Sequence, residues 1–332
     1  MRHYSAWVIV EGKMRSPVFS RSVYALIFLF AALYPIRGAT LLTSDDIRAR
    51  LVLESYRRAY PNKISAVEWK DGDWSATIDG KVFFWAHGRL LPEAETASWS
   101  DFKPYFFYVY PEAVRDPSSY SKERIEELRI QGDADVRISG ADHHDAFRAA
   151  LYGGSTRAAA ERKLVKTKLL GRQVSVHTDI VEAVRRVDLN IQEAVARSKA
   201  NADFIASIAS LGGYNWREIR GTGRRSYHSW GLAIDIQPKK LGSKAIFWEW
   251  ERERNKNWML VPHEKRWAPP IDIIKAFEKE GFIWGGKWDF YDNMHFEYRP
   301  ELHELRKVYS AVGSTEVLLA ARAEKGQSPS QN

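Results

Sequence analysis

The fold is decided by the stretch Ser226-Tyr227-His228-Ser229-Trp230-Gly231-Leu232-Ala233-Ile234-Asp235. A second stretch, Asp292-Asn293-Met294-His295-Phe296-Glu297-Tyr298, lies nearer the C-terminus. Two imidazoles and a carboxylate are enough for a three-ligand zinc site that leaves the fourth tetrahedral position for a water. A second carboxylate, Asp292, stands three residues before His295 and is placed to take a proton from that water. The two stretches together indicate a zinc hydrolase.

The apolar run behind Gly231 predicts a short buried strand that ends at Asp235. A carboxylate at the end of a core strand is costly unless it is paired or bound to a metal. Further on, Met294, Phe296 and Tyr298 alternate with His295 and Glu297, which is the period-two pattern of a strand. Asp292 would lie on the face opposite His295 if the strand began there. We therefore expect Asp292 in the turn that precedes the strand.

The two stretches resemble the zinc D-alanyl-D-alanine carboxypeptidase and L-alanyl-D-glutamate endopeptidase family, which trims bacterial cell-wall peptides. The family signature S-x-H-x-x-G-x-A-x-D is filled by Ser226, His228, Gly231, Ala233 and Asp235, and its later acidic-x-x-His-Phe segment by Asp292 and His295. The run Gly281–Trp288 is similar to the family's lead-in to its last ligand, so the resemblance spans roughly residues 170–305.

This resemblance implies roles for individual residues. The zinc ligands would be His228, Asp235 and His295, and the general base would be Asp292, an acid typical of the endopeptidase branch rather than of the carboxypeptidases. The family also has an arginine upstream of the first ligand that steadies the developing oxyanion. Arg217 is preferred for this role because it follows Gly213-Tyr214, with Arg220 as the second candidate; Ser226 and Arg220 are expected to bind substrate. We expect Arg224 and Arg225 to be solvated loop charges.

The first 39 residues look like an export signal. They hold five Lys/Arg against one Glu, and the uninterrupted apolar run from Val23 to Leu33 follows Arg15 and Arg21. This run is shorter than the roughly 20 residues that cross a bilayer. Residues 1–39 are therefore predicted to be a signal peptide or a retained N-terminal anchor, and the protein to be exported to the periplasm or cell envelope. The chain has a formal net charge of +8, half of it in this segment, so the charge does not argue for nucleic acid.

Residues 40–160 are predicted to form a small α+β region. A helix is expected over 44–60, short strands between 66 and 91 with hairpin turns at Asp71-Gly72 and Asp79-Gly80, a buried strand over 105–110, and helices over 121–130 and 146–151. Two Asp-Gly pairs between alternating apolar residues are the strongest local signal in this part of the chain.

Residues 161–310 are predicted to be the catalytic domain and 311–332 a polar C-terminal tail. A polar connector is expected from 153 to 168, a strand at 174–176, an amphipathic helix over 179–198 and another after Pro269-Pro270. Four tryptophans (Trp248, Trp250, Trp258 and Trp267) lie in a charged insert between the two ligand stretches, where the family would place a substrate-facing loop.

The expected fold class is α+β, with a central antiparallel sheet flanked by helices in the catalytic domain. By the resemblance, the protein is a zinc-dependent peptidase acting on peptidoglycan stem peptides, either as a carboxypeptidase or as an L-alanyl-D-glutamate endopeptidase. The alternative is a catalytically inactive zinc-containing wall-binding or signalling module of the same fold, as in hedgehog signalling domains. The acid at position 292 favours the enzyme, and the export signal disfavours a nucleic-acid partner.

Export is testable with a reporter. An enzyme that is active only outside the cytoplasm, fused after Thr40, should become active because the basic and apolar segment directs the fusion across the membrane. A fusion that lacks residues 15–33 is the control. Abundant but inactive full-length fusion in the cytoplasm would contradict the prediction.

Overall fold

The computed structural model describes residues 44–138, 141–219, 222 and 224–312. The predicted signal segment 1–39, Arg220 and most of the predicted tail 311–332 lie outside these residues. Among the described helices, none is long and apolar enough to cross a membrane.

The N-terminal region is a helix against a four-stranded antiparallel sheet. Helix α2 (Ser44–Ala59) packs on a meander whose strands are β1 (Ile64–Lys70), β2 (Asp73–Ile78), β3 (Lys81–Phe84) and β4 (Leu91–Pro92). Both predicted hairpins are confirmed. Asp71 and Gly72 have φ of +51° and +90°, and Asp79 and Gly80 have +47° and +75°, the left-handed pair that a tight two-residue turn requires.

The strand predicted over residues 105–110 is wrong. This segment has no regular secondary structure in the described chain. Its rings are instead anchored one by one: Phe107 stacks on Trp85 at 5.5 Å, and the Tyr110 hydroxyl donates to Glu278 Oε1 at 2.5 Å. Tyr105, Phe107 and Tyr110 are buried whereas Phe106 is exposed, and no described strand pairs with this segment.

Four helices connect the N-terminal sheet to the second half of the chain. They are α3 (Lys122–Gln131), α4 (Ala134–Ile138), α5 (Ala146–Tyr152) and α6 (Arg157–Glu161). The predicted helices at 121–130 and 146–151 are confirmed, and the Ser121 hydroxyl caps α3 by accepting from the Arg124 N–H at 3.2 Å. The polar connector predicted over 153–168 is wrong, because it contains α6 and most of a strand.

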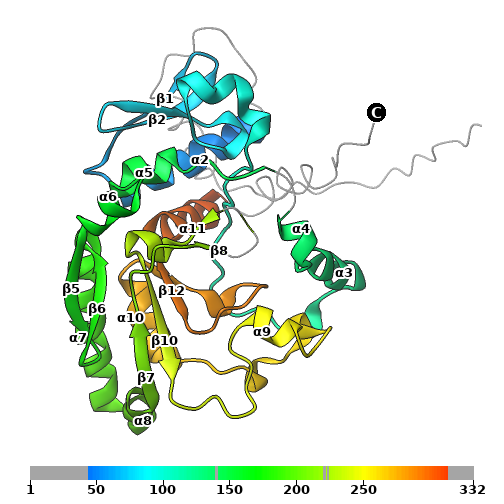
Figure 1. Ribbon diagram of the computed structural model, residues 1–332, viewed down its shortest axis with the longest axis vertical. Helices are drawn as coiled ribbons and strands as arrows, with labels where there is room; N and C mark the ends of the chain where they lie inside the picture. The colour runs from blue at the N-terminus through cyan, green and yellow to red at the C-terminus, as the bar shows by residue number, and fades with distance from the viewer. Residues whose placement is uncertain (1–43, 139–140, 220–221, 223, 313–332) are drawn as a thin grey trace, which may run out of the picture. The chain divides into compact units, whose positions relative to one another are not determined.

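The second half is built on another four-stranded antiparallel sheet, in the order β11 (Phe282–Trp284), β12 (His295–Tyr298), β10 (Ala233–Pro238) and β7 (Ile208–Gly212). Figure 1 shows β10, β12 and β7 near one another, with α10 and α7 alongside. Two smaller hairpins accompany the sheet: β5 (Leu164–Leu169) with β6 (Arg172–His177), and β8 (Glu218–Ile219) with β9 (Arg224–Arg225).

Helices cover one face of this sheet. Helix α7 (Val181–Arg197) packs against α10 (Ile271–Lys279), and both were predicted from their apolar stripes. Phe277 of α10 stacks on Phe296 of β12 at 4.0 Å, so the helix covers the face opposite His295. The remaining helices are α8 (Lys199–Ser207), α9 (Trp248–Arg252) and α11 (Pro300–Val312). Helices and antiparallel sheets together confirm the α+β class.

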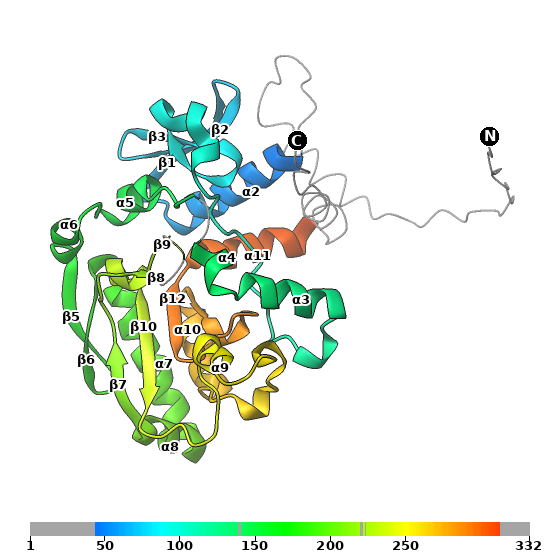
Figure 2. The same ribbon diagram turned by 45° about the vertical axis from the view of Figure 1, so that its right-hand side comes forward.

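The core runs across the predicted boundary near residue 160. Helix α11 packs against α2 (Figure 2), and buried residues of both halves join one cluster that includes Tyr56, Phe147, Tyr227 and Leu302. A second, smaller cluster lies under the charged insert and includes Leu128, Trp248 and Trp258. The division into two domains stays a prediction.

Gly231 offers a test of how the site is folded. Its φ is +68°, and a β-carbon there would lie 2.7 Å from the backbone nitrogen of His177. Gly231→Ala should cost about 2–5 kcal/mol, because left-handed strain adds to a steric clash in the core. Gly72→Ala is the matched control: its φ is +90° but open space surrounds it, so it should cost only about 1–2 kcal/mol. Urea unfolding measures both, and equal losses would contradict the predicted clash.

Candidate metal centre

His228 is placed by a capped turn. It lies in the 3-10 turn η5 (Tyr227–Trp230), and the Ser226 hydroxyl accepts from the His228 N–H at 3.3 Å at the start of that turn. Gly231 ends the turn in a left-handed conformation, which sends the chain into β10. Ser226, predicted to bind substrate, is buried and holds the turn that carries His228.

Asp235 and His295 are placed by strand pairing. Strands β10 and β12 run antiparallel, with Asp235 directly opposite His295. Side chains opposite each other on such a pair lie on the same face and within contact distance. Asp292 lies before β12, where its carbonyl accepts from the His295 N–H at 3.2 Å to close the turn. The prediction that Asp292 precedes the strand in a turn is confirmed.

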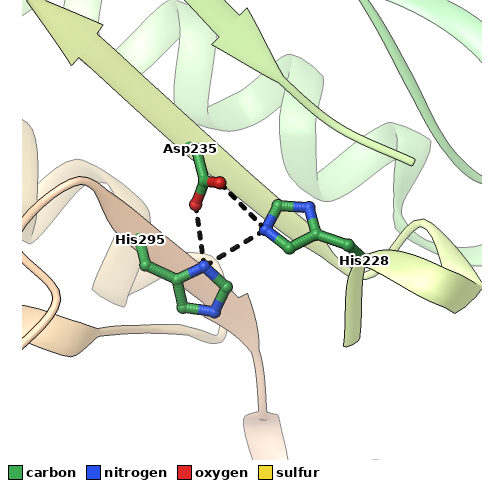
Figure 3. Close-up of side chains that lie close together, drawn as sticks. All are labelled: His228, Asp235 and His295. Atoms are coloured by element: carbon green, nitrogen blue, oxygen red, sulfur yellow. Dashed lines mark hydrogen bonds and ion pairs between the residues drawn. The ribbon is translucent and has the colours of Figure 1, made fainter. Parts of the chain in front are cut away.

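The three side chains meet at one point (Figure 3). His295 Nδ1 lies 2.8 Å from Asp235 Oδ1, His228 Nε2 lies 3.2 Å from Asp235 Oδ2, and the two ring nitrogens are 3.2 Å apart. One nitrogen or oxygen from each of the three residues falls within 4.8 Å of the others, and among the described residues this group could hold a metal ion.

The ring of His228 is oriented from behind. Its Nδ1 donates to the Gly213 carbonyl at 2.5 Å, which leaves the Nε2 lone pair facing Asp235. Gly213 is required for this approach, because a β-carbon there would lie 2.4 Å from the Ser175 carbonyl oxygen. A histidine with one nitrogen bound to a carbonyl presents the other as a neutral ligand.

The ring of His295 is oriented by a chain of buried charges. Its Nε2 lies 3.2 Å from Glu297 Oε1, and Arg299 Nη1 donates to Glu297 Oε2 at 3.4 Å. Arg299 also pairs with Glu301, to which the Tyr60 hydroxyl of the N-terminal region donates at 3.2 Å. Burial alone would raise the pKa of Glu297, but the His295 hydrogen bond and the nearby arginines lower it to about 2. The sequence showed Glu297 only as one member of an alternating strand.

Asp292 has a carboxylate that the protein leaves partly unsatisfied. Burial raises its pKa to about 7; the charges of His295 and Arg217 oppose this shift, and that of Asp235 adds to it. Its Oδ1 is inaccessible and has no hydrogen-bond partner. An orphaned carboxylate oxygen on which the charges of His295 and Asp235 act fits a metal site with an adjoining water. The two imidazoles and the carboxylate of His228, Asp235 and His295 are a donor set that zinc favours.

Arg217 lies at the edge of the site. Its backbone is fixed by the Ser229 hydroxyl, which accepts from the Arg217 N–H at 2.9 Å, and its side chain is exposed. Its positive charge lowers the pKa of Asp292 and so opposes the effect of burial. The expectation that Arg224 and Arg225 are solvated is wrong: both are half-buried, and Arg225 pairs with Asp145 at 3.1 Å.

Two histidines and an aspartate, brought together by a 3-10 turn and two paired strands, define a candidate metallohydrolase centre. Comparison with known proteins agrees with this class. A family model described as D-alanyl-D-alanine carboxypeptidase matches residues 220–298, and a domain of unknown function matches residues 52–107. The first match covers both signature stretches and all three clustered residues, so the resemblance predicted from the sequence is confirmed over this segment.

One curated relative is similar to part of the chain. It is peptidoglycan L-alanyl-D-glutamate endopeptidase CwlK of Bacillus subtilis (strain 168), 40% identical over 80 residues, which are 24% of this chain and 42% of the relative. The chain thus aligns with less than half of that protein's length. No solved structure matches.

The buried contact between Glu297 and His295 predicts a measurable effect on metal binding. Glu297→Gln should weaken zinc binding about 10- to 100-fold, because the partner that orients a ligating histidine loses its charge. Competition with a chromophoric chelator measures the dissociation constant. Glu278→Gln is the control, since Glu278 is a half-buried acid paired with Lys287 at 2.7 Å in another part of the fold. An unchanged constant in Glu297→Gln would refute the assignment.

Proposed function

We propose that the protein is a zinc-dependent peptidase that hydrolyses peptide bonds in peptidoglycan stem peptides. The observation that carries the proposal is the position of Asp292, whose unpartnered carboxylate oxygen lies in the electrostatic range of His295 and Asp235. A structural metal site does not need a further carboxylate held in this way, whereas a hydrolytic site does.

Each of the clustered residues would have a separate role in such a reaction. His228, Asp235 and His295 would hold the zinc. When bound, zinc polarises a carbonyl and makes a water acidic near neutral pH. Asp292 would accept the proton of the attacking water and deliver it to the leaving amine. A pKa raised by burial suits this double role, because the group must both take and release a proton near neutral pH.

Arg217 would face the developing negative charge. Its guanidinium is exposed at the edge of the site and acts electrostatically on Asp292. A fixed cation near the reacting carbonyl stabilises an oxyanion more than the neutral substrate. Ser226 would act through His228, whose backbone it caps, and Arg220 remains a proposed substrate contact outside the described residues.

The peptide bond that is cleaved is inferred from the aspartate at position 292 and from the similar Bacillus subtilis protein. An aspartate as base is typical of the endopeptidase branch, and the similar Bacillus subtilis protein is named an L-alanyl-D-glutamate endopeptidase. Peptidoglycan lies outside the cytoplasmic membrane, which agrees with the export signal proposed for residues 1–39. The inactive wall-binding alternative is less well supported, because a site without catalysis does not need a proton acceptor at Asp292.

Replacing the proposed base tests the enzyme directly. Asp292→Asn should lower turnover of a wall tetra- or pentapeptide by about 10²- to 10⁴-fold, because the proton acceptor is lost while size is kept. Zinc content should not change. Mass spectrometry of the products and metal analysis make the two measurements. Asp289→Asn, on the same loop but paired with Arg124 and Arg115, is the control and should keep wild-type turnover.

The pH profile adds a second readout. Wild-type kcat/KM should fall as pH drops through about 7 or below, because Asp292 must be ionised to act and a bound cation only lowers its pKa. That acid limb should be absent from the residual activity of Asp292→Asn. Undiminished turnover in the variant would remove Asp292 from the mechanism, and a wild type inactive on every wall peptide would favour the binding module.

A further inference from the structure

A row of three aromatic side chains extends from the metal centre to the surface. The Trp288 ring lies 5.7 Å from the ring of His295, a proposed metal ligand, and its Nε1 donates to the Tyr108 hydroxyl at 2.7 Å. The Tyr108 ring in turn lies 5.3 Å from the Phe106 ring. Tyr108 and Trp288 are half-buried, whereas Phe106 is 68% exposed. These three side chains, here called the aromatic strip, begin beside a proposed ligand and end in solvent.

Two of the three rings belong to an irregular segment whose backbone is anchored on both sides. On one side, the N–H of the buried Tyr105 donates to the Gly88 carbonyl at 2.8 Å. On the other side, the hydroxyl of the buried Tyr110 accepts from the N–H of Trp284, in β11, at 2.9 Å. Phe106 is therefore held at the surface by its neighbours. A ring on a pre-organised backbone loses little conformational freedom when a ligand covers it.

The middle of the strip also adjoins the charges that support the metal centre. Burial raises the pKa of Tyr108, and the charges of Arg299 and Glu297 act on its hydroxyl. Glu297 is the residue that contacts His295 Nε2. The strip thus meets the metal centre at two points, through the Trp288 ring against His295 and through the Tyr108 hydroxyl in the electrostatic range of Glu297.

This continuity with the site separates Phe106 from other exposed aromatic residues. Single exposed rings are ordinary on a protein surface and need no ligand to explain them. Trp69 is such a case: it is 46% exposed and packs on Trp74 across the β1–β2 hairpin. Phe106 instead continues a row of contacts that starts at a proposed metal ligand. The molecule that covers Phe106 is therefore inferred to be the one that reaches the metal.

The chemistry of the proposed substrate indicates which part of it could cover a phenyl ring. In a stem peptide cut between L-alanine and D-glutamate, L-alanine is the only amino acid on the acyl side of the bond. Its nitrogen is joined to the lactyl group of an N-acetylmuramic acid, so any contact farther out on that side is made with a sugar. The residues on the other side are D-glutamate, a diamino acid and D-alanine, none of which has a large apolar side chain. The C–H groups on one face of a pyranose ring give the apolar surface that an aromatic face covers.

We propose that the aromatic strip of Phe106, Tyr108 and Trp288 binds an amino-sugar ring of the glycan strand while the attached stem peptide lies at the metal centre. This assignment rests on the proposed function and extends it, because the substrate becomes a stem peptide that is still joined to its sugar. Phe106 contacts the sugar, and Tyr108 holds Trp288 in place through the hydrogen bond to its indole. The segment that supplies Phe106 and Tyr108 lies outside residues 220–298, so this specificity belongs to the N-terminal region of the chain.

The first test compares a disaccharide-linked wall tetrapeptide with the same tetrapeptide N-acetylated, which removes the charge of a free amine. Wild-type protein should have a kcat/KM about 10-fold higher for the linked peptide, the scale of covering a large apolar side chain. Phe106→Ala should lose this preference through KM and keep its kcat on the N-acetylated peptide. Phe106→Tyr keeps the aromatic face and should retain the preference. Trp69→Ala, the matched control at another exposed ring, should also retain it. Mass spectrometry of the products measures the rates.

The second test does not depend on peptidase activity. The peptide-free disaccharide of N-acetylglucosamine and N-acetylmuramic acid should give saturation-transfer NMR signals with wild-type protein, whereas maltose should not. Phe106→Ala should abolish these signals and Phe106→Tyr should keep them. If no wall peptide is cleaved, the proposed function fails and the disaccharide signals alone decide the strip: their loss in Phe106→Ala supports it, and their absence from wild type overturns it.

Three further results would contradict the proposal. The first is an equal kcat/KM for the linked and N-acetylated peptides in wild-type protein. The second is a preference, or a set of disaccharide signals, that survives in Phe106→Ala. The third is a dimer, seen by light scattering, that dissociates in Phe106→Ala, because this would assign the exposed ring to contact with a second copy of the chain.

Discussion

The antiparallel pairing of β10 with β12 is the constraint on which the site depends. It sets Asp235 opposite His295, and a slip of one residue would turn either side chain to the face covered by α10. The register is held by the apolar residues on that other face, above all Phe296 against Phe277. The packing of a hydrophobic layer therefore fixes the position of two polar side chains that do not pack in it.

The second consequence of this register is a buried ionic interior. Because His295 and Glu297 lie on the same face of β12, the residues that support the metal centre point inward, towards Arg299, Glu301 and Tyr60. Tyr60 belongs to the region before residue 160, so that region takes part in holding a proposed ligand of the site. Breaking one member of such a chain leaves another charge buried and unpaired, which costs far more than a surface ion pair contributes.

Local signals in the sequence predicted what local interactions decide. The Asp-Gly turns, the stripe of α7 and the spacing from His228 to Asp235 depend on residues close in the chain, and all three agree with the structure. Residues 105–110 and Arg224 were misjudged because their surroundings come from distant segments. Glu297 was missed for the same reason: nothing in the strand pattern shows that Arg299, four residues after His295, pairs with Glu297.

The site is also a place where folding and function oppose each other. The pKa of Asp292 is higher in the folded chain than in an unfolded one, because burial disfavours its charge. Between about pH 4 and 7 the folded state therefore binds more protons at this group, and stability falls as pH rises through that range. A cation held by His228, Asp235 and His295 would reverse this penalty, since it favours the ionised carboxylate. The ionised form of Asp292 is the form that accepts a proton in the proposed reaction, and it is also the form that a bound metal ion would stabilise. The stability of this part of the fold is therefore coupled to metal binding.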